Sequence, residues 1–140
     1  MGTGYFTQPS LCADRIVFVC EDDLWEVDSS GGQARRLTNS RSEIKTPYLD
    51  PSSKLIACCA KEEGDPDVYL MSADGGPLTR LTWLNSVTRI VGWTPDGSSI
   101  LFHSIHQAVH HRGSDAWLFK VGVDGGPVQR LPFGPAVSLN

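Results

Sequence analysis

The stretch Asp67-Val68-Tyr69-Leu70-Met71, followed by Asp74-Gly75-Gly76 and then by Arg80-Leu81-Thr82, occurs three times in this chain with small changes. The first copy runs from Asp23-Leu24-Trp25 through Gly31-Gly32 to Arg36-Leu37-Thr38, and the third runs from Asp115-Ala116-Trp117 through Asp124-Gly125-Gly126 to Arg130-Leu131-Pro132. The leading aspartate recurs after 44 residues and then after 48 (Asp23, Asp67, Asp115). Repeats of roughly 40–50 residues are typical of β-propellers, in which one repeat forms one blade.

A second shared pattern precedes each copy. The clearest example is the turn sequence 91–97 (VGWTPDG), followed by the apolar run 99–102, and weaker versions occupy 47–59 and 9–20. Each repeat therefore predicts four strands, with glycine turns supplying the positive φ angles that tight hairpins need. The second strand of each repeat is apolar at successive positions, which indicates a sheet buried on both faces.

These patterns predict an all-β chain that forms part of a β-propeller, with three four-stranded blades and the first strand of a fourth. We expect blade 1 at about 5–40, blade 2 at about 41–84, blade 3 at about 85–133 and the start of blade 4 at 134–140. A propeller usually has four to eight blades, so the arc leaves apolar faces to be covered by further blades or by a second copy of the chain.

Composition narrows the possible functions. The 140 residues carry a formal charge of −4, which argues against a nucleic-acid partner. No apolar run approaches the length of a membrane span, and Met1–Phe6 has the pattern of neither a signal peptide nor a myristoylation site. The cysteines have no CxxC spacing, so we expect reduced thiols in a cytoplasmic protein (Cys12, Cys20, Cys58, Cys59).

The order of turn, apolar run, aromatic strand and Gly-Gly…Arg-Leu-Thr resembles the TolB-type or PD40 propeller repeat. Three stretches, in the same order along the chain, resemble the first propeller of tricorn-type proteases (4–6 with 14–27, 91–97, and 125–136). The resemblance covers essentially the whole chain. It implies a cytoplasmic, self-compartmentalising, oligomeric serine peptidase that begins with a six-bladed propeller, of which this chain would form half.

In that family a seven-bladed propeller, catalytic domains and a PDZ-like module follow. The resemblance therefore implies that catalytic residues lie beyond residue 140, and no serine here lies in a G-x-S-x-G turn. We expect no catalytic residue and no cofactor in this segment. Its implied role is that of a scaffold and peptide gate, with peptides and the remaining propeller and protease domains as partners. The alternative is a stand-alone propeller module that closes its ring by homodimerisation.

One candidate substrate-binding residue follows from the resemblance. The family's archaeal type places two arginines in the loop before the third blade, with the implied role of anchoring a substrate's C-terminal carboxylate. The corresponding segment, Trp83 to Arg89, holds the single Arg89. Arg89 is therefore the candidate anchor, and an ordinary solvated charge is the alternative.

Two further clusters are expected to be structural. The histidines lie in or beside a long loop, where a solvated polar segment is favoured over adventitious metal or a metalloenzyme site (His103, His106, His110, His111). The acidic groups 21–23 and 62–67 occur at equivalent turns and lack the spacing of a calcium loop. We therefore predict no metal site.

Overall fold

In the computed structural model, the described residues are 7–39, 42–61, 64–84, 86–105 and 117–132. They form three four-stranded antiparallel sheets, each with its strands in sequence order. Blade 1 contains β1 (Thr7–Cys12), β2 (Arg15–Cys20), β3 (Asp23–Asp28) and β4 (Arg35–Arg36). Blade 2 contains β5 (Glu43–Leu49), β6 (Leu55–Lys61), β7 (Asp67–Ser72) and β8 (Thr79–Arg80). Blade 3 contains β9 (Thr88–Trp93), β10 (Ser99–Ser104), β11 (Trp117–Gly122) and β12 (Gly125–Arg130).

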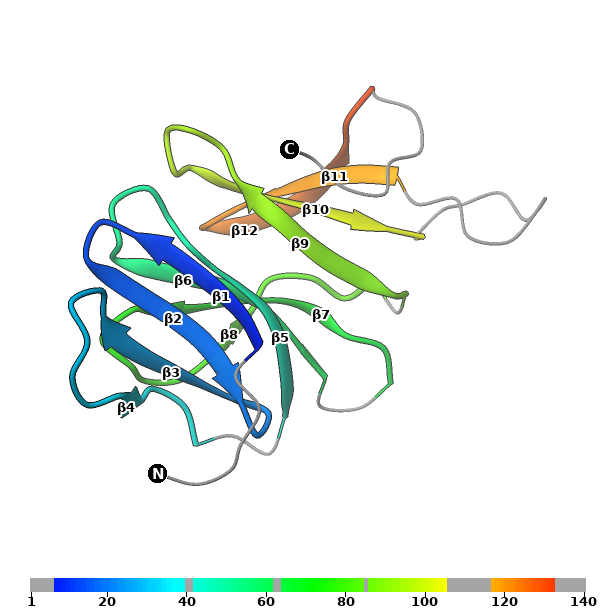
Figure 1. Cartoon of the computed structure of the whole chain (residues 1–140). Helices are drawn as coiled ribbons and strands as arrows, with labels where there is room; N and C mark the ends of the chain where they lie inside the picture. The colour runs from blue at the N-terminus through cyan, green and yellow to red at the C-terminus, as the bar shows by residue number, and fades with distance from the viewer. Residues whose placement is uncertain (1–6, 40–41, 62–63, 85, 106–116, 133–140) are drawn as a thin grey trace.

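The three blades fan out from a common side, where their first strands β1, β5 and β9 lie next to one another (Figure 1). This is the blade arrangement of a propeller, so the predicted fold class is confirmed. The described residues contain no helix, and therefore none that could cross a bilayer. Residues 134–140, predicted to start a fourth blade, lie outside the described residues.

The core consists of two clusters, one in each gap between blades. In β6 the residues from Ile56 to Ala60 are all buried, and their side chains alternate between the two gaps. Cys58 belongs to the cluster shared with blade 1, whereas Cys59 belongs to the cluster shared with blade 3. Successive side chains of a strand point to opposite faces of its sheet, so adjacent residues of β6 pack in different gaps between blades. Because both faces of β6 are covered, its buried residues are all apolar.

Each first strand carries a β-bulge. The pairing registers shift between Thr7 and Ser10 in β1, between Lys45 and Tyr48 in β5, and beside Gly92 in β9. A bulge adds one residue to one strand and increases the local twist. The bulges therefore bend the three inner strands at equivalent places.

The register of β11 corrects one alignment made from the sequence. Asp67 pairs with Ala60 in blade 2, and the equivalent residue of blade 3 is Trp117, which pairs with Ser104. The backbone bonds agree, because Leu81 N donates to Val68 O and Leu131 N donates to Leu118 O, both at 2.8 Å. Equating Asp115 with the recurring aspartate was therefore wrong by two residues. The counterpart of Trp25 and Tyr69 is Phe119 rather than Trp117.

Candidate functional site

The recurring Asp, Arg and Thr of the repeat form a structural cluster that joins the third and fourth strands. In blade 2 the Asp67 carboxylate accepts hydrogen bonds from Arg80 Nη2 at 2.6 Å and from Thr82 Oγ1 at 2.7 Å. Thr82 Oγ1 in turn accepts a hydrogen bond from the backbone N–H of Val68 at 3.0 Å. Each polar atom in this cluster serves a neighbour within the blade, so the motif is explained by folding.

Blade 1 repeats the cluster, whereas blade 3 replaces it. In blade 1, Thr38 Oγ1 donates to Asp23 Oδ1 at 2.6 Å and Arg36 forms an ion pair with the same carboxylate. In blade 3, Arg130 lies over the ring of Trp117, with 4.6 Å between its Cζ and the ring centroid. In blade 2, Arg80 has both its ion pair with Asp67 and a cation–π contact with Trp83, whereas Arg130 has the cation–π contact without an ion pair to a described carboxylate.

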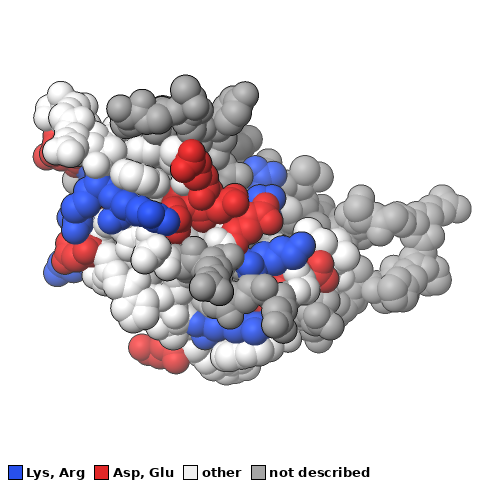
Figure 2. Space-filling model, turned by 90° about the horizontal axis from the view of Figure 1, so that it is seen from below, with Lys and Arg blue, Asp and Glu red and all other residues white. Residues whose placement is uncertain are grey.

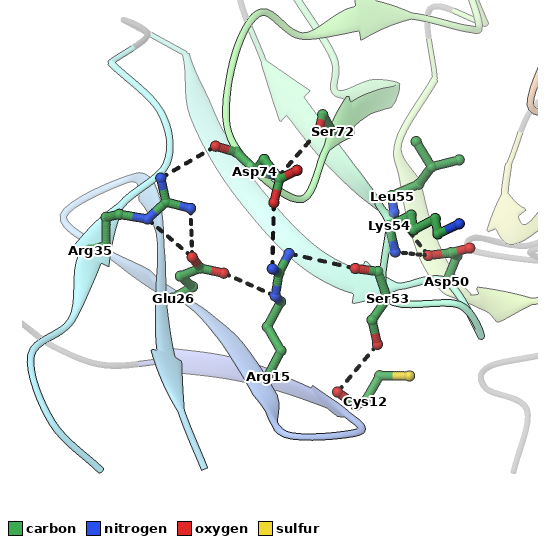
Figure 3. Close-up of polar contacts among 10 residues, drawn as sticks. All are labelled: Cys12, Arg15, Glu26, Arg35, Asp50, Ser53, Lys54, Leu55, Ser72 and Asp74. Atoms are coloured by element: carbon green, nitrogen blue, oxygen red, sulfur yellow. Dashed lines mark hydrogen bonds and ion pairs between the residues drawn. The ribbon is translucent and has the colours of Figure 1, made fainter. Parts of the chain in front are cut away.

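A second polar network links blade 1 to blade 2 (Figure 3). The carboxylate of the half-buried Glu26 forms ion pairs with Arg35 at 2.6 Å and with Arg15 at 3.2 Å. Arg15 also reaches Asp74 Oδ1 at 3.4 Å, and Arg35 donates to the backbone oxygen of Asp74 at 3.3 Å. Both guanidinium groups bind Asp74 in the neighbouring blade, so this network stabilises the contact between blades 1 and 2 and is not a candidate ligand site.

The candidate residue Arg89 lines a cavity of about 480 Å³ between blades 2 and 3, which we call the inner cavity. It lies at the end of the arc where β5 and β9 begin. Figure 2 shows the face of the molecule that lies at the bottom of Figure 1, with acidic and basic side chains side by side near its centre. The residues lining the inner cavity are Glu43, Lys45, Thr46, Cys59, Lys61, Asp65, Pro66, Val87, Thr88 and Arg89.

Lys45 and Arg89 occupy equivalent positions in two successive inner strands. Lys45 pairs with Cys59 on β6, and Arg89 pairs with His103 on β10. Lys45 forms an ion pair with Glu43 at 2.6 Å. That hydrogen bond raises the pKa of Lys45 and lowers the pKa of Glu43. In contrast, Arg89 has no ion pair with any of the carboxylates that the structure describes.

The thiol in the inner cavity is not a nucleophile. Cys59 is buried and its Sγ donates a hydrogen bond to Thr88 O at 3.3 Å. Burial raises the pKa of this thiol to about 11, so the protonated form dominates at neutral pH. Nothing in the sequence indicates that Cys59 and Arg89 line the same cavity, because the two residues belong to different blades.

His103 is the member of the histidine group that the structure describes; His106, His110 and His111 lie outside the described residues. Its Nε2 is buried and has no hydrogen-bond partner among the described atoms. Burial, and then the neighbouring Arg89, lower the pKa of His103 and favour the neutral ring. Within the described residues no three potential metal ligands gather.

The acidic residues between β2 and β3 form a tight hairpin turn. Glu21 and Asp22 both have positive φ, at 51° and 67°, and connect the paired residues Cys20 and Asp23. Positive φ at both central residues is the geometry of a type I′ hairpin. Asp23 itself belongs to the structural cluster of blade 1. In the second acidic group, Asp67 belongs to the cluster of blade 2, and residues 62 and 63 lie outside the described residues.

The family model and the sequence relatives point to one family. A family model described as the tricorn protease N-terminal β-propeller domain matches residues 3–140. A putative tricorn protease homolog from Streptomyces coelicolor is 36% identical, and the match covers 96% of this chain and 12% of that protein. The crystal structure of the tricorn protease superposes with a TM-score of 0.82 at 26% identity, covering 96% of this chain and 14% of that one.

The fold is shared more widely. A putative TolB from Agrobacterium tumefaciens superposes with a TM-score of 0.78 at 21% identity. That match covers 95% of this chain and 48% of the TolB chain. The chain therefore spans about an eighth of the length of these tricorn proteins and about half of the putative TolB chain.

Proposed function

Because this chain belongs to the tricorn protease N-terminal β-propeller family, we propose that it is the scaffold and peptide-gating segment of a tricorn-like serine peptidase. In this proposal the segment contributes no catalytic group. It presents one wall of a channel through which peptides reach protease domains elsewhere in the assembly. The proposed location is the cytoplasm, and the proposed partners are peptides together with the remaining propeller and protease domains.

The observation that carries this proposal is the position of Arg89. It lines the inner cavity beside the first strands of two blades, and no described carboxylate neutralises its charge. A guanidinium in that situation suits the C-terminal carboxylate of a peptide, with which it forms paired, charge-assisted hydrogen bonds. Arg89 is thus the proposed substrate-binding residue of this segment.

Two measurements test the proposal. The purified protein should hydrolyse no fluorogenic peptide, since none of its serines is assigned a catalytic role. It should bind a short peptide that ends in a free carboxylate better than the same peptide with a C-terminal amide. Activity that is abolished by replacing a serine within this chain would overturn the first part. Equal affinity for the peptide with a free C-terminal carboxylate and for its C-terminal amide would overturn the role of Arg89.

A second candidate is a stand-alone propeller that closes its ring as a homodimer. It is favoured by one face of blade 1, where the apolar residues Ile16, Trp25 and Val27 share one side of the sheet and each is only partly buried. The equivalent faces of blades 2 and 3 are buried against a neighbouring blade. Light scattering after size exclusion should then give a mass close to twice 15.3 kDa; a monomer would rule this candidate out.

A further inference from the structure

The outer strands of blades 2 and 3 border a cavity of about 360 Å³, which we call the outer groove. Thr79 and Arg80 of β8 line it, together with Trp83, which follows that strand, and Asp124, which precedes β12. Trp83 is 69% exposed, the largest value among the large apolar residues that the structure describes. The outer groove thus brings an open indole ring and an exposed aspartate into one cavity.

The equivalent gap between blades 1 and 2 shows what an aspartate at this position binds. Asp74 precedes the Gly-Gly turn of blade 2 in the same way as Asp124 precedes that of blade 3. Arg15 Nη2 of blade 1 lies 3.4 Å from Asp74 Oδ1, and Arg35 Nη1 donates to the backbone oxygen of Asp74 at 3.3 Å (Figure 3). In that gap the aspartate therefore binds arginine side chains of the preceding blade.

Blade 2 does not supply such arginines to blade 3. The strand registers place Leu55 at the position of Arg15, and Thr79 at the position of Arg35. Among the described residues, no ion pair involves Asp124. The outer groove therefore keeps the aspartate of the repeat but lacks the two guanidinium groups that bind its counterpart.

The indole of Trp83 is a second difference between the two gaps. Residues 36–39 (Arg-Leu-Thr-Asn) of blade 1 correspond to residues 80–83 (Arg-Leu-Thr-Trp) of blade 2, and Asn39 lines the cavity between blades 1 and 2. The fold thus accepts a polar residue where Trp83 stands. Arg80 lies over the indole, with 5.3 Å between its Cζ and the ring centroid, and orients the ring. An exposed, oriented indole can bind a further cation through its ring face.

We infer that the outer groove binds an arginine side chain of a partner protein, with the guanidinium paired to Asp124 and stacked on Trp83. A guanidinium suits both contacts, because it is planar, stacks on aromatic rings and pairs with carboxylates. The net charge of −4 favours a cationic partner. A Cβ built at Gly125 or Gly126 meets no atom within 4 Å, so the turn beside Asp124 leaves room for a partner's backbone. Tryptophan is also prominent among the residues that dominate the affinity of protein interfaces.

The test uses tripeptides with alanine on both sides of a central arginine, lysine or citrulline. Citrulline keeps the planar shape of arginine without its charge. Both peptide ends are blocked, by acetyl and amide groups, so that the proposed binding of a terminal carboxylate by Arg89 does not contribute. Each peptide is titrated into isotope-labelled protein, and the affinity is taken from the NMR signals of the Gly125 and Gly126 backbone amides, which line the outer groove.

Three variants are titrated in the same way. Trp83→Asn introduces the residue that blade 1 has at this position, and Asp124→Asn removes the carboxylate of the outer groove. Asp14→Asn is the matched control, because it removes an exposed carboxylate of blade 1 that does not line the outer groove. Thermal unfolding of all variants is measured alongside.

We expect the arginine peptide to bind about fivefold more tightly than the citrulline peptide, the size expected from one cation–π contact and one exposed ion pair. The lysine peptide should lie between the two, because an ammonium group does not stack on the indole as a guanidinium does. Trp83→Asn and Asp124→Asn should each weaken binding of the arginine peptide by about threefold. Asp14→Asn should leave its affinity unchanged.

Several results would overturn the inference. Signals of Gly125 and Gly126 that do not move, or equal affinity for the arginine and citrulline peptides, would show that the outer groove does not select a guanidinium. A loss of affinity in Asp14→Asn equal to that in Asp124→Asn would reduce the effect to the overall charge of the protein. Lower thermal stability of Trp83→Asn with unchanged affinity would assign the indole to folding. Signals that move when the protein alone is concentrated would make a second copy of the chain the occupant.

Discussion

The guanidinium of Arg130 lies over the indole ring of Trp117, with 4.6 Å between its Cζ and the ring centroid. In blade 2 the equivalent arginine, Arg80, bonds the buried carboxylate of Asp67 at 2.6 Å. Arg80 also lies over the ring of Trp83, with 5.3 Å between its Cζ and the ring centroid, so the ion pair with Asp67 is what distinguishes it from Arg130. This difference has consequences for stability.

Arg80→Met should destabilise the protein more than Arg130→Met. Removing Arg80 leaves the Asp67 carboxylate buried without its cation, at a cost of about 2–3 kcal/mol, below the range for fully buried pairs because Arg80 is partly exposed. Removing Arg130 loses a partly exposed cation–π contact of about 0.5–1 kcal/mol. Urea unfolding of both variants measures the difference, and equal losses would show that the carboxylate is not stabilised by Arg80.

The misplaced aspartate shows how far sequence reasoning reached. The Gly-Gly turn and the arginine recur 50 residues apart between blades 2 and 3 (Gly75 to Gly125, Arg80 to Arg130), whereas the aspartates were matched at 48. The inconsistency of two residues was visible in the sequence. An Asp and an aromatic residue recur together in the sequence, but the equivalent positions are set by the pairing of the third strand with the fourth.

The repeat predicted the blades because periodicity and burial on both faces are local signals. The inner cavity was not predictable in the same way. The residues that line it include members of β5, β6 and β9. Lys45 forms an ion pair with Glu43, two residues before it, whereas the residue two places before Arg89 is the apolar Val87. The sequence indicated Arg89 through a family resemblance, but gave no sign that Cys59 of blade 2 lines the same cavity. Such neighbours follow only from the register of strands in different blades.

Arg89→Gln should weaken peptide binding more than Lys45→Gln. The guanidinium of Arg89, which forms no ion pair with a described carboxylate, is the proposed partner of the terminal carboxylate, and loss of a charge-assisted hydrogen bond of roughly 1.5 kcal/mol corresponds to about a tenfold weaker affinity. Lys45 is already occupied by Glu43, so its loss should change the affinity by less than about threefold. Isothermal titration with a free-acid peptide measures both, and a larger effect at Lys45 would assign the anchor to blade 2.

Thiol labelling should divide the four cysteines into two pairs. Cys58 and Cys59 are almost fully buried, and burial raises the pKa of both thiols, that of Cys59 to about 11. Cys12 and Cys20 are half-buried. Iodoacetamide at pH 7.5 should therefore modify Cys12 and Cys20 in the folded protein, and Cys58 and Cys59 only after unfolding, as mass spectrometry of tryptic peptides can follow. Rapid modification of Cys59 without denaturant would mean that the gap between blades 2 and 3 opens readily.

The stability of blade 3 should depend on pH through His103. Its pKa in the folded protein is lowered from the ordinary value near 6.5, first by burial and then by Arg89. Between the folded value and about 6.5 the unfolded chain binds more protons than the folded one, so stability rises with pH across that interval. The contribution of the neutral ring is complete above about 6.5 and is lost as the pH falls through the folded pKa.

Urea unfolding at pH 5 and pH 7.5, compared between the wild-type protein and His103→Gln, isolates this group because every other titrating residue is common to both. The wild-type protein should lose more stability at pH 5 than His103→Gln does. Arg89→Gln removes the second cause of the lowered pKa while leaving burial in place, so its pH dependence should fall between the two. Identical losses in the wild-type protein and His103→Gln would mean that His103 takes up its proton in the folded blade without cost, which the buried Nε2, without a hydrogen-bond partner among the described atoms, argues against.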